Sequence, residues 1–217
     1  KPQPKTLPMV EVIITHFKPF FLGMLICMAG YVLFYIMIAF SQIYAKSAPT
    51  VSEAGYAMGL GFSPQIFTAL LMCSAISLAI TIAISGKYID IVGRRIWLIW
   101  TTVGVALFGL VLPYFLENGT TLSLFWFLII GMGLIGMGYG PLASFLPELF
   151  PTHARYSGAS LTYNIAGLFG ASVAAIIALP LNANYGLKGV GIYLTLNAVL
   201  SLIGLWFITE TRDRQLL

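Results

Sequence analysis

Charged residues that could form specific contacts are concentrated in a few short segments of this chain. Residues 86–95, GKYIDIVGRR, hold one aspartate, one lysine and two arginines, although only 8% of the chain is charged. Gly86 and Gly93 would permit a turn with positive φ, and the arginines could bind anionic lipid. Asp90 would be stabilised by an arginine or a helix N-terminus. The segment therefore indicates either a contact that changes with conformation or a loop that only anchors the fold.

Residues for enzymatic chemistry are absent from the apolar stretches. The histidines, His16 and His153, are peripheral, and the seven acids lie in loops or at helix ends: Glu11, Glu53, Asp90, Glu117, Glu148, Glu210 and Asp213. An enzyme needs a nucleophile with a base, or clustered ligands. Cys27 and Cys73 lie inside apolar stretches and are expected to pack as small hydrophobic residues. We therefore expect no enzyme, cofactor or metal site.

The composition indicates an all-α membrane protein. The chain has 217 residues, of which 59% are hydrophobic, and a mean hydropathy of +0.94. Crossing a hydrocarbon core takes about 20 apolar residues, and continuous apolar runs indicate helices rather than a barrel. Ser63 and Pro64 predict a capped helix start. Six transmembrane helices are predicted at residues 19–44, 63–85, 96–116, 120–146, 155–181 and 188–209.

The positive charges predict the orientation in the membrane. Six is an even number, so both termini are expected on one side. That side holds Lys1, Lys5, Lys18, Lys87, Arg94, Arg95, Arg155, Arg212 and Arg214, whereas only Lys46 and Lys188 lie on the other. The positive-inside rule then places both termini in the cytoplasm, and the net charge of +4 gives no reason to expect nucleic acid. We expect residues 1–18 to be the cytoplasmic end of a linker in a longer protein, 19–209 the helical bundle and 210–217 a cytoplasmic tail.

Small residues are concentrated in two of the predicted helices. Five glycines lie within Gly131–Gly140, and residues 157–172 read SGASLTYNIAGLFGAS. Because lipid provides no hydrophobic driving force between helices, close contact depends on small residues. The fourth and fifth helices are therefore expected to pack against partners, and the third and sixth, rich in large apolar residues, to face lipid.

Two motifs resemble those of a known transporter family. Residues 86–95 are similar to the major facilitator superfamily loop G-x-L-x-D-x-x-G-R-R/K, with Tyr88 where leucine is commonest. Residues 147–164, PELFPTHARYSGASLTYN, resemble the connection between the tenth and eleventh helices of the metabolite:proton symporter family, and ITETRD at 208–213 resembles the end of its twelfth helix. The resemblance implies the C-terminal six-helix half of a twelve-helix fold.

The resemblance also implies a site. The first, second, fourth and fifth helices would line a central cavity, and their polar residues become substrate-binding candidates: Tyr31, Tyr35, Gln42, Ser74, Ser77, Tyr139, Tyr163 and Asn164. The alternative for each is packing between helices or bonding to its own backbone. The two motifs would form a conformational latch of Gly86, Asp90, Gly93, Arg94, Arg95, Glu148 and Arg155, with Glu148 and Arg155 as a possible pair across one turn.

The implied function is secondary active transport in a bacterial inner membrane. Alternating access would move a small polar metabolite, an organic acid or a zwitterionic osmolyte, together with a proton. The expected partners are the missing N-terminal half, the substrate, protons and membrane lipid. Since no acid lies well inside a helix here, the proton-coupling carboxylate is expected in the missing half. A sugar-type facilitator or uniporter is the alternative, and a six-helix channel is less favoured because no polar or charged pore ring is evident.

Overall fold

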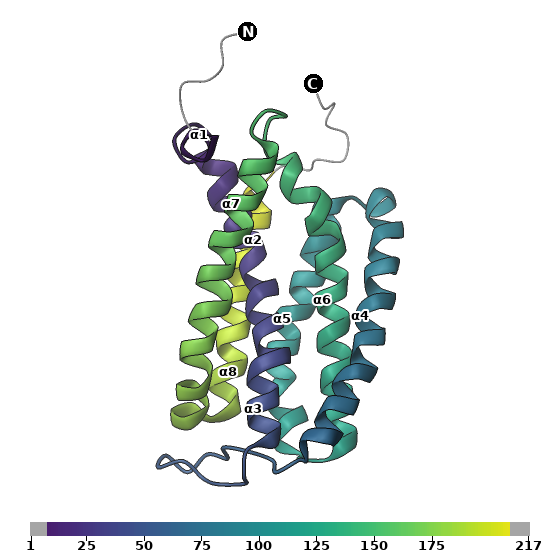
Figure 1. The fold of residues 1–217 in the computed structure, drawn as a ribbon, viewed down its shortest axis with the longest axis vertical. Coiled ribbons are helices and arrows are strands. Elements are labelled where there is room, and N and C mark those ends of the chain that lie inside the picture. Colours follow the sequence, from purple (N-terminus) through teal and green to yellow (C-terminus); the bar gives the residue numbers. More distant parts are fainter. Residues whose placement is uncertain (1–7, 209–217) are drawn as a thin grey trace.

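The computed structural model describes residues 8–208, which form a bundle of long helices (Figure 1). Its elements are α1 (Pro8–Thr15), α2 (Phe17–Tyr35), the π-helix η1 (Ile36–Phe40), α3 (Ser41–Lys46), α4 (Pro64–Val92), α5 (Arg94–Glu117), α6 (Thr121–Glu148), α7 (Arg155–Gly167), the π-helix η2 (Leu168–Ser172) and α8 (Val173–Phe207). Gly186, with φ of 67°, interrupts α8, and residues 187–207 run back along the bundle.

Six membrane crossings follow from this arrangement. Within residues 8–208, five continuous helical stretches are long and apolar enough to span a membrane. The last of them, Arg155–Phe207, has 53 residues and turns at Gly186, so it supplies two crossings. The all-helical prediction is confirmed, and the count is five or six long apolar helices according to whether the last stretch is taken as one or two. Both α1 and the end of α8 lie at the same end of the bundle, as an even number of crossings requires (Figure 1).

The helix boundaries agree with the sequence prediction except at the end of α4. Ser63 caps α4 as expected, since its hydroxyl accepts a hydrogen bond of 3.3 Å from the backbone N–H of Ile66. The prediction of a turn from residue 86 is wrong, because α4 continues to Val92 and Gly86 is helical. Only Gly93 needs the backbone freedom of glycine there, with φ of 100°. The turn between α4 and α5 is thus a single residue.

The segment before the first span contains a short helix that the sequence analysis did not predict. Helix α1 lies within residues 1–18, which were expected to form the end of a linker, and it packs against α7 and α2. Val12 is its fully buried anchor. The linker prediction for residues 1–7 and the tail prediction for 210–217 lie outside the described residues.

Close contact between α4 and α6 depends on glycine, as the sequence predicted. A Cβ on Gly136 would overlap the Thr81 hydroxyl and lie 2.6 Å from the carbonyl oxygen of Leu78, and one on Gly140 would overlap the Ser85 hydroxyl. The Ser77 hydroxyl also donates a hydrogen bond of 3.0 Å to the carbonyl oxygen of Ile129 across this interface. Small residues therefore bring the two backbones close enough for direct hydrogen bonding.

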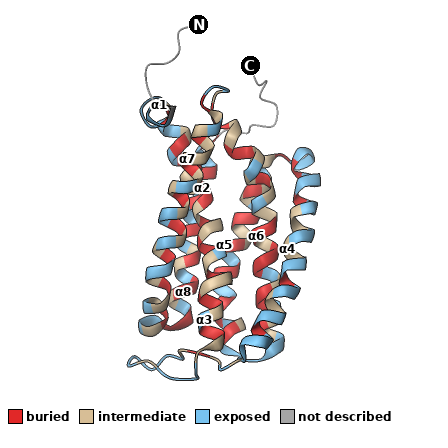
Figure 2. Cartoon of the chain, in the orientation of Figure 1, coloured by how far each residue is buried: buried red, intermediate tan, exposed pale blue. Residues whose placement is uncertain are grey.

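The third and sixth helices are less exposed to lipid than the sequence analysis expected. Residues 187–207 pack between α2 and α5, where Ser201 accepts a hydrogen bond from the Ala29 N–H and donates one to the Leu25 carbonyl oxygen. Helix α5 buries one face and exposes the other, which includes Trp100 and Tyr114. The least buried long helix is α4, which Figure 2 shows exposed along most of its outer side.

The glycine contacts generate a stability prediction. Gly136→Ala is expected to destabilise the protein by about 1–3 kcal/mol, because the added methyl group overpacks the α4–α6 interface. Gly86→Ala is the matched control, since a Cβ there meets no atom within 4 Å, and it is expected to stabilise α4 by roughly 0.5–1 kcal/mol. Thermal unfolding in detergent measures both. Equal melting temperatures for the two variants would contradict the proposed packing.

Candidate functional site

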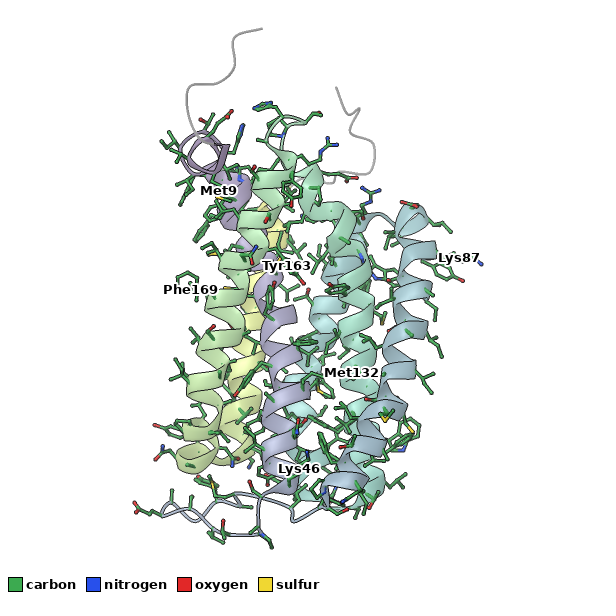
Figure 3. The ribbon with its side chains drawn as sticks, in the orientation of Figure 1. Met9, Lys46, Lys87, Met132, Tyr163 and Phe169 are labelled. Carbon is green, nitrogen blue, oxygen red and sulfur yellow. The ribbon has the colours of Figure 1, made fainter. Side chains whose placement is uncertain are left out.

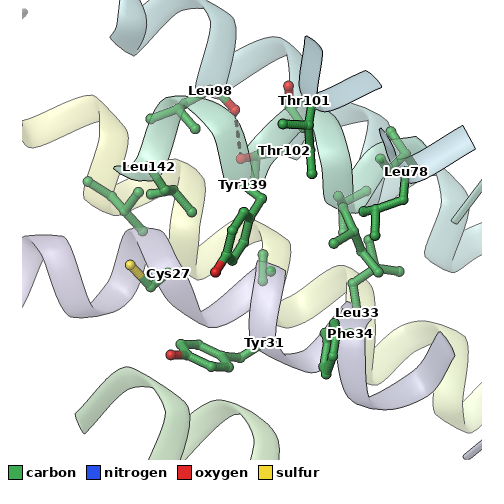
Figure 4. A pocket seen from close by; sticks show the side chains of 18 of the residues that line it. Cys27, Tyr31, Leu33, Phe34, Leu78, Leu98, Thr101, Thr102, Tyr139 and Leu142 are labelled. Atoms are coloured by element: carbon green, nitrogen blue, oxygen red, sulfur yellow. Dashed lines mark hydrogen bonds between the residues drawn. The ribbon is translucent and has the colours of Figure 1, made fainter. Parts of the chain in front are cut away.

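A cavity of about 300 Å³ opens between five helices near the middle of the bundle (Figure 4). Its walls come from α2, α4, α5, α6 and α7 and are mostly apolar, with Leu33, Leu78 and Leu142 among them. Its polar groups are few, and the tyrosines Tyr31 and Tyr139 supply the largest. A mostly apolar pocket with a few placed polar groups is the usual form of a small-molecule site.

Three predicted tyrosines meet where this cavity joins a second pocket of about 590 Å³ between α6 and α7. Tyr139 and Tyr163 line both, and the ring centroids of Tyr31 and Tyr163 are 5.0 Å apart. Figure 3 shows Tyr163 on the side of α7 that faces α2 and α6. A Cβ on Gly170 would lie 2.6 Å from the Tyr31 Cβ, so glycine in η2 lets this tyrosine pack closely. The structure thus brings together hydroxyls from three helices.

The other five predicted binding residues lie outside these two pockets. Four hydroxyl or amide groups bond to the backbone: Tyr35 to Ala175, Ser74 to Leu71, Ser77 to Ile129 and Asn164 to Ser160. Gln42 lines a separate shallow pocket beside Lys46, near the other end of the bundle. For Tyr35, Ser74, Ser77 and Asn164 these bonds are of the kind that the sequence analysis gave as the alternative to substrate binding.

The sequence analysis missed part of the lining. Cys27 lies in the wall of the first cavity, and the third helix contributes Thr101 and Thr102, although it was expected to be peripheral. Each threonine hydroxyl donates to a carbonyl oxygen of its own helix, as Figure 4 shows for Thr102 and Leu98 at 2.7 Å. The available sequence signal for this part of the lining was the pair of adjacent threonines in an apolar helix. Whether they face the cavity, however, depends on how the helices pack.

A group of charged residues closes the end of the bundle where α4, α5 and α6 meet. The guanidinium of Arg94 forms an ion pair with the Glu148 carboxylate, and its second nitrogen lies 3.6 Å from Asp90. The side chains of Arg94 and Glu148 are 19% and 15% exposed, whereas that of Asp90 is 71% exposed. Arg95 donates hydrogen bonds to the carbonyl oxygens of Leu205 and Trp206 at the end of α8. The two arginines therefore join four helices.

Arg155 has a different position from the one expected. The possible ion pair between Glu148 and Arg155 is not formed, since within residues 8–208 the ion pair of Glu148 is with Arg94. Arg155 instead begins α7 and lines the second pocket, together with Tyr156 and Ser160. Its Nε atom is buried and has no hydrogen-bond partner in the described part of the chain. This places a cation with unused hydrogen-bonding capacity in the same pocket as Tyr139 and Tyr163.

Comparison with known proteins identifies the family. Residues 58–217 match the family described as sugar (and other) transporter, so this integral membrane chain belongs to that family of the major facilitator superfamily, a family of transporters rather than enzymes. No solved structure matches the chain.

Named relatives agree with this assignment. A protein of Haemophilus influenzae, provisionally named a metabolite transport protein, is 89% identical over 216 residues, which are all of this chain and 48% of that protein. The inner membrane metabolite transport protein YhjE of Escherichia coli is 38% identical over 211 residues, 97% of this chain and 46% of YhjE. A proline/betaine transporter of Salmonella typhimurium is 32% identical over 135 residues, 61% of this chain and 27% of that protein. The chain spans about half the length of the first two.

The charged group generates a second prediction. Glu148→Gln is expected to destabilise the protein by about 1–3 kcal/mol, because it leaves the half-buried Arg94 without its ion-pair partner. Asp90→Asn, the matched control, is expected to cost less than about 1 kcal/mol, because its longer contact is solvent-exposed. Chemical or thermal unfolding of both variants gives the comparison. If Asp90→Asn lowered the free energy of unfolding as much as Glu148→Gln does, the Arg94–Glu148 pair would not be the dominant ion pair of Arg94.

Proposed function

We propose that this chain is the C-terminal six-helix half of a secondary active transporter in a bacterial inner membrane, with both termini in the cytoplasm. A second six-helix half would complete the protein and form the other wall of the substrate path, and alternating access would come from rocking of the two halves. The relatives support this, because the chain covers about half of proteins named for metabolite transport. The orientation is supported by the positive charges, because Arg94, Arg95 and Arg155 begin helices at the same end of the bundle as Lys87, whereas Lys46 lies at the opposite end (Figure 3).

The single observation that carries the proposal is the meeting of Tyr31, Tyr139 and Tyr163 at the junction of two pockets. Their hydroxyls can donate and accept hydrogen bonds, and their rings can contact an apolar or cationic substrate group. The two pockets together extend from the apolar cavity, past the tyrosine hydroxyls, to the end of the bundle. This arrangement suits transport of a substrate better than catalysis of a reaction. No acid or histidine within residues 8–208 lines either pocket.

The substrate class we propose is a small carboxylate, either an organic acid or a zwitterion. Arg155 could accept the carboxylate, since a guanidinium binds that group through two parallel hydrogen bonds, and its buried Nε lacks a partner in the described residues. The tyrosine rings could hold an ammonium group of a zwitterion by cation–π attraction. The relative named as a proline/betaine transporter supports a zwitterion.

The charged group of Arg94, Glu148 and Arg95 is proposed as a cytoplasmic latch. It joins the ends of α4, α5, α6 and α8, so a rocking motion that separates these ends must break the ion pair or move it as a unit. Asp90 lies mostly exposed beside Arg94 and is available to the second half. Gly93 supplies the tight turn, whereas Gly86 has only a helical role.

Proton coupling is proposed to depend on the second half. A proton relay needs an ionisable group that faces the bundle interior, and no carboxylate or imidazole within residues 8–208 lines the two pockets. A sugar-type facilitator or uniporter is the second candidate, favoured because the matched family is described as sugar (and other) transporters.

Uptake into vesicles that contain the full-length protein tests the function. A panel of labelled carboxylates and betaines is supplied with and without an imposed proton gradient. Accumulation of one compound above its external concentration only with the gradient is the expected result. Gradient-independent equilibration of the compound would favour the uniporter instead. Absence of movement for carboxylates and betaines, with uptake of sugars, would overturn the proposed substrate class.

Substitutions in the same assay test the site. Tyr163→Phe and Tyr31→Phe are expected to raise KM by about threefold to tenfold, since each removes one hydrogen bond of roughly 0.5–1.5 kcal/mol. Arg155→Gln is expected to raise KM for a carboxylate by about tenfold to a hundredfold, because the lost bond is charged. The control is Tyr114→Phe on the exposed face of α5. An effect of Tyr114→Phe equal to that of Tyr163→Phe would contradict the assignment.

A further inference from the structure

Three residues with metal-binding side chains meet at the end of the bundle where α1 lies. Glu11 is in α1, His16 joins α1 to α2, and His153 is in the loop between α6 and α7. One ligand atom of each lies within 4.8 Å of the others, and the Glu11 Oε1 atom is 3.0 Å from the His153 Nε2 atom. We propose that these residues form a binding site for a divalent transition metal ion such as Zn²⁺. The sequence analysis expected no metal site, because it found histidines and acids only outside the apolar stretches.

The spacing of the ligand atoms fits such an ion. In tetrahedral coordination with metal–ligand distances near 2.1 Å, ligand atoms are separated by roughly 3.4 Å. The Glu11 and His153 atoms, 3.0 Å apart, need to separate by only roughly 0.4 Å, and the ring centroids of His16 and His153 are 6.2 Å apart, tilted by 57°. The remaining adjustment is at most roughly 1.5 Å, which rotation of an imidazole side chain can supply.

The backbone around the three ligands is held in place without the metal. Val12, next to Glu11, is fully buried, and its carbonyl oxygen accepts a hydrogen bond of 3.0 Å from the His16 N–H. On the other side, the buried Ala154 follows His153, and its N–H donates to the carbonyl oxygen of Pro151 at 3.0 Å. A bound ion would therefore order side chains more than backbone, so little conformational entropy opposes binding.

The ligand set indicates which ions bind. Two imidazoles and one carboxylate suit Zn²⁺, Ni²⁺ or Cu²⁺, whereas Mg²⁺ and Ca²⁺ prefer oxygen ligands alone. The His153 side chain is 61% exposed and that of Glu11 is 19% exposed, so water can complete the coordination. A site with three protein ligands and an open position binds reversibly, which fits a regulatory role better than a structural one.

The position of the site implies a consequence for transport, and this part rests on the proposed function. The ion would tie α1, which precedes the first span, to the loop between Glu148 and Arg155. Glu148 belongs to the proposed latch, and Arg155 belongs to the proposed substrate path. A metal bridge would therefore oppose movement of the loop between them. Zn²⁺ is then expected to inhibit uptake.

Binding is tested directly on the full-length protein in detergent. Zn²⁺ is titrated in competition with a chromophoric chelator for the wild type, His16→Gln, His153→Gln and the control Glu53→Gln, whose carboxylate lies in the loop at the opposite end. We expect the wild type and Glu53→Gln to bind Zn²⁺ equally, and each histidine variant to lose at least tenfold in affinity at one site. The proposal would be overturned if a histidine variant with the wild-type melting temperature bound Zn²⁺ as tightly as the wild type does.

A second measurement uses the wild type alone, so it does not depend on how the variants fold. X-ray absorption at the zinc edge of the one-to-one complex should show two imidazole nitrogens among the ligands. A coordination sphere without imidazole would overturn the site.

The transport consequence is measured separately, as uptake with and without Zn²⁺. Inhibition in the wild type and Glu53→Gln, relieved in His153→Gln, supports the bridge. Zn²⁺ binding without inhibition would overturn the regulatory role, whereas a lack of uptake in every condition would count against the proposed function and leave the binding result standing.

Discussion

The packing of α4 against α6 is the constraint on which the rest of this bundle depends. Lipid provides no hydrophobic driving force for the association of two apolar helices, so their contact must be stabilised by close packing and hydrogen bonds. Gly136 and Gly140 remove the side chains that would separate the helices, and Ser77 bonds to the opposite backbone. Because α4 makes this contact along one face only, its other face stays exposed, and the cavity opens between α2, α4, α5, α6 and α7.

The spans around the cavity include irregular segments and side-chain bonds to a helix backbone. Ser201 bonds to both the Leu25 carbonyl and the Ala29 N–H, partners in the regular hydrogen-bond pattern of α2. The π-helices η1 and η2 lie in facing spans, and Tyr31 packs against Gly170 of η2. Short π-helices often occur at functional sites because they change the direction of nearby side chains. The π-helix η2 thus supplies the glycine against which Tyr31 packs.

The ion pairs among residues 8–208 lie at one end of the bundle, apart from the apolar cavity. There the Arg94–Glu148 ion pair and the Arg95 hydrogen bonds connect helix ends, and the Glu11, His16 and His153 cluster connects α1 to the neighbouring loop. Interactions between charged groups near water are weak enough to break and reform, whereas the apolar interfaces are not. This division suits the proposed function, in which the helices move together as a rigid body and the contacts at one end must break before they move.

The sequence by itself determined the number of spans, the capped start of α4 and the packing role of the glycines, because hydropathy and capping act within a few turns of one helix. Only the tertiary structure decided that Gly86 is helical, that Glu148 pairs with Arg94 rather than Arg155, and that Tyr31 meets Tyr163. It also decided that Tyr35, Gln42, Ser74, Ser77 and Asn164 lie outside the two pockets. These outcomes depend on the rotation of each helix about its axis, which is set by packing between residues far apart in the chain.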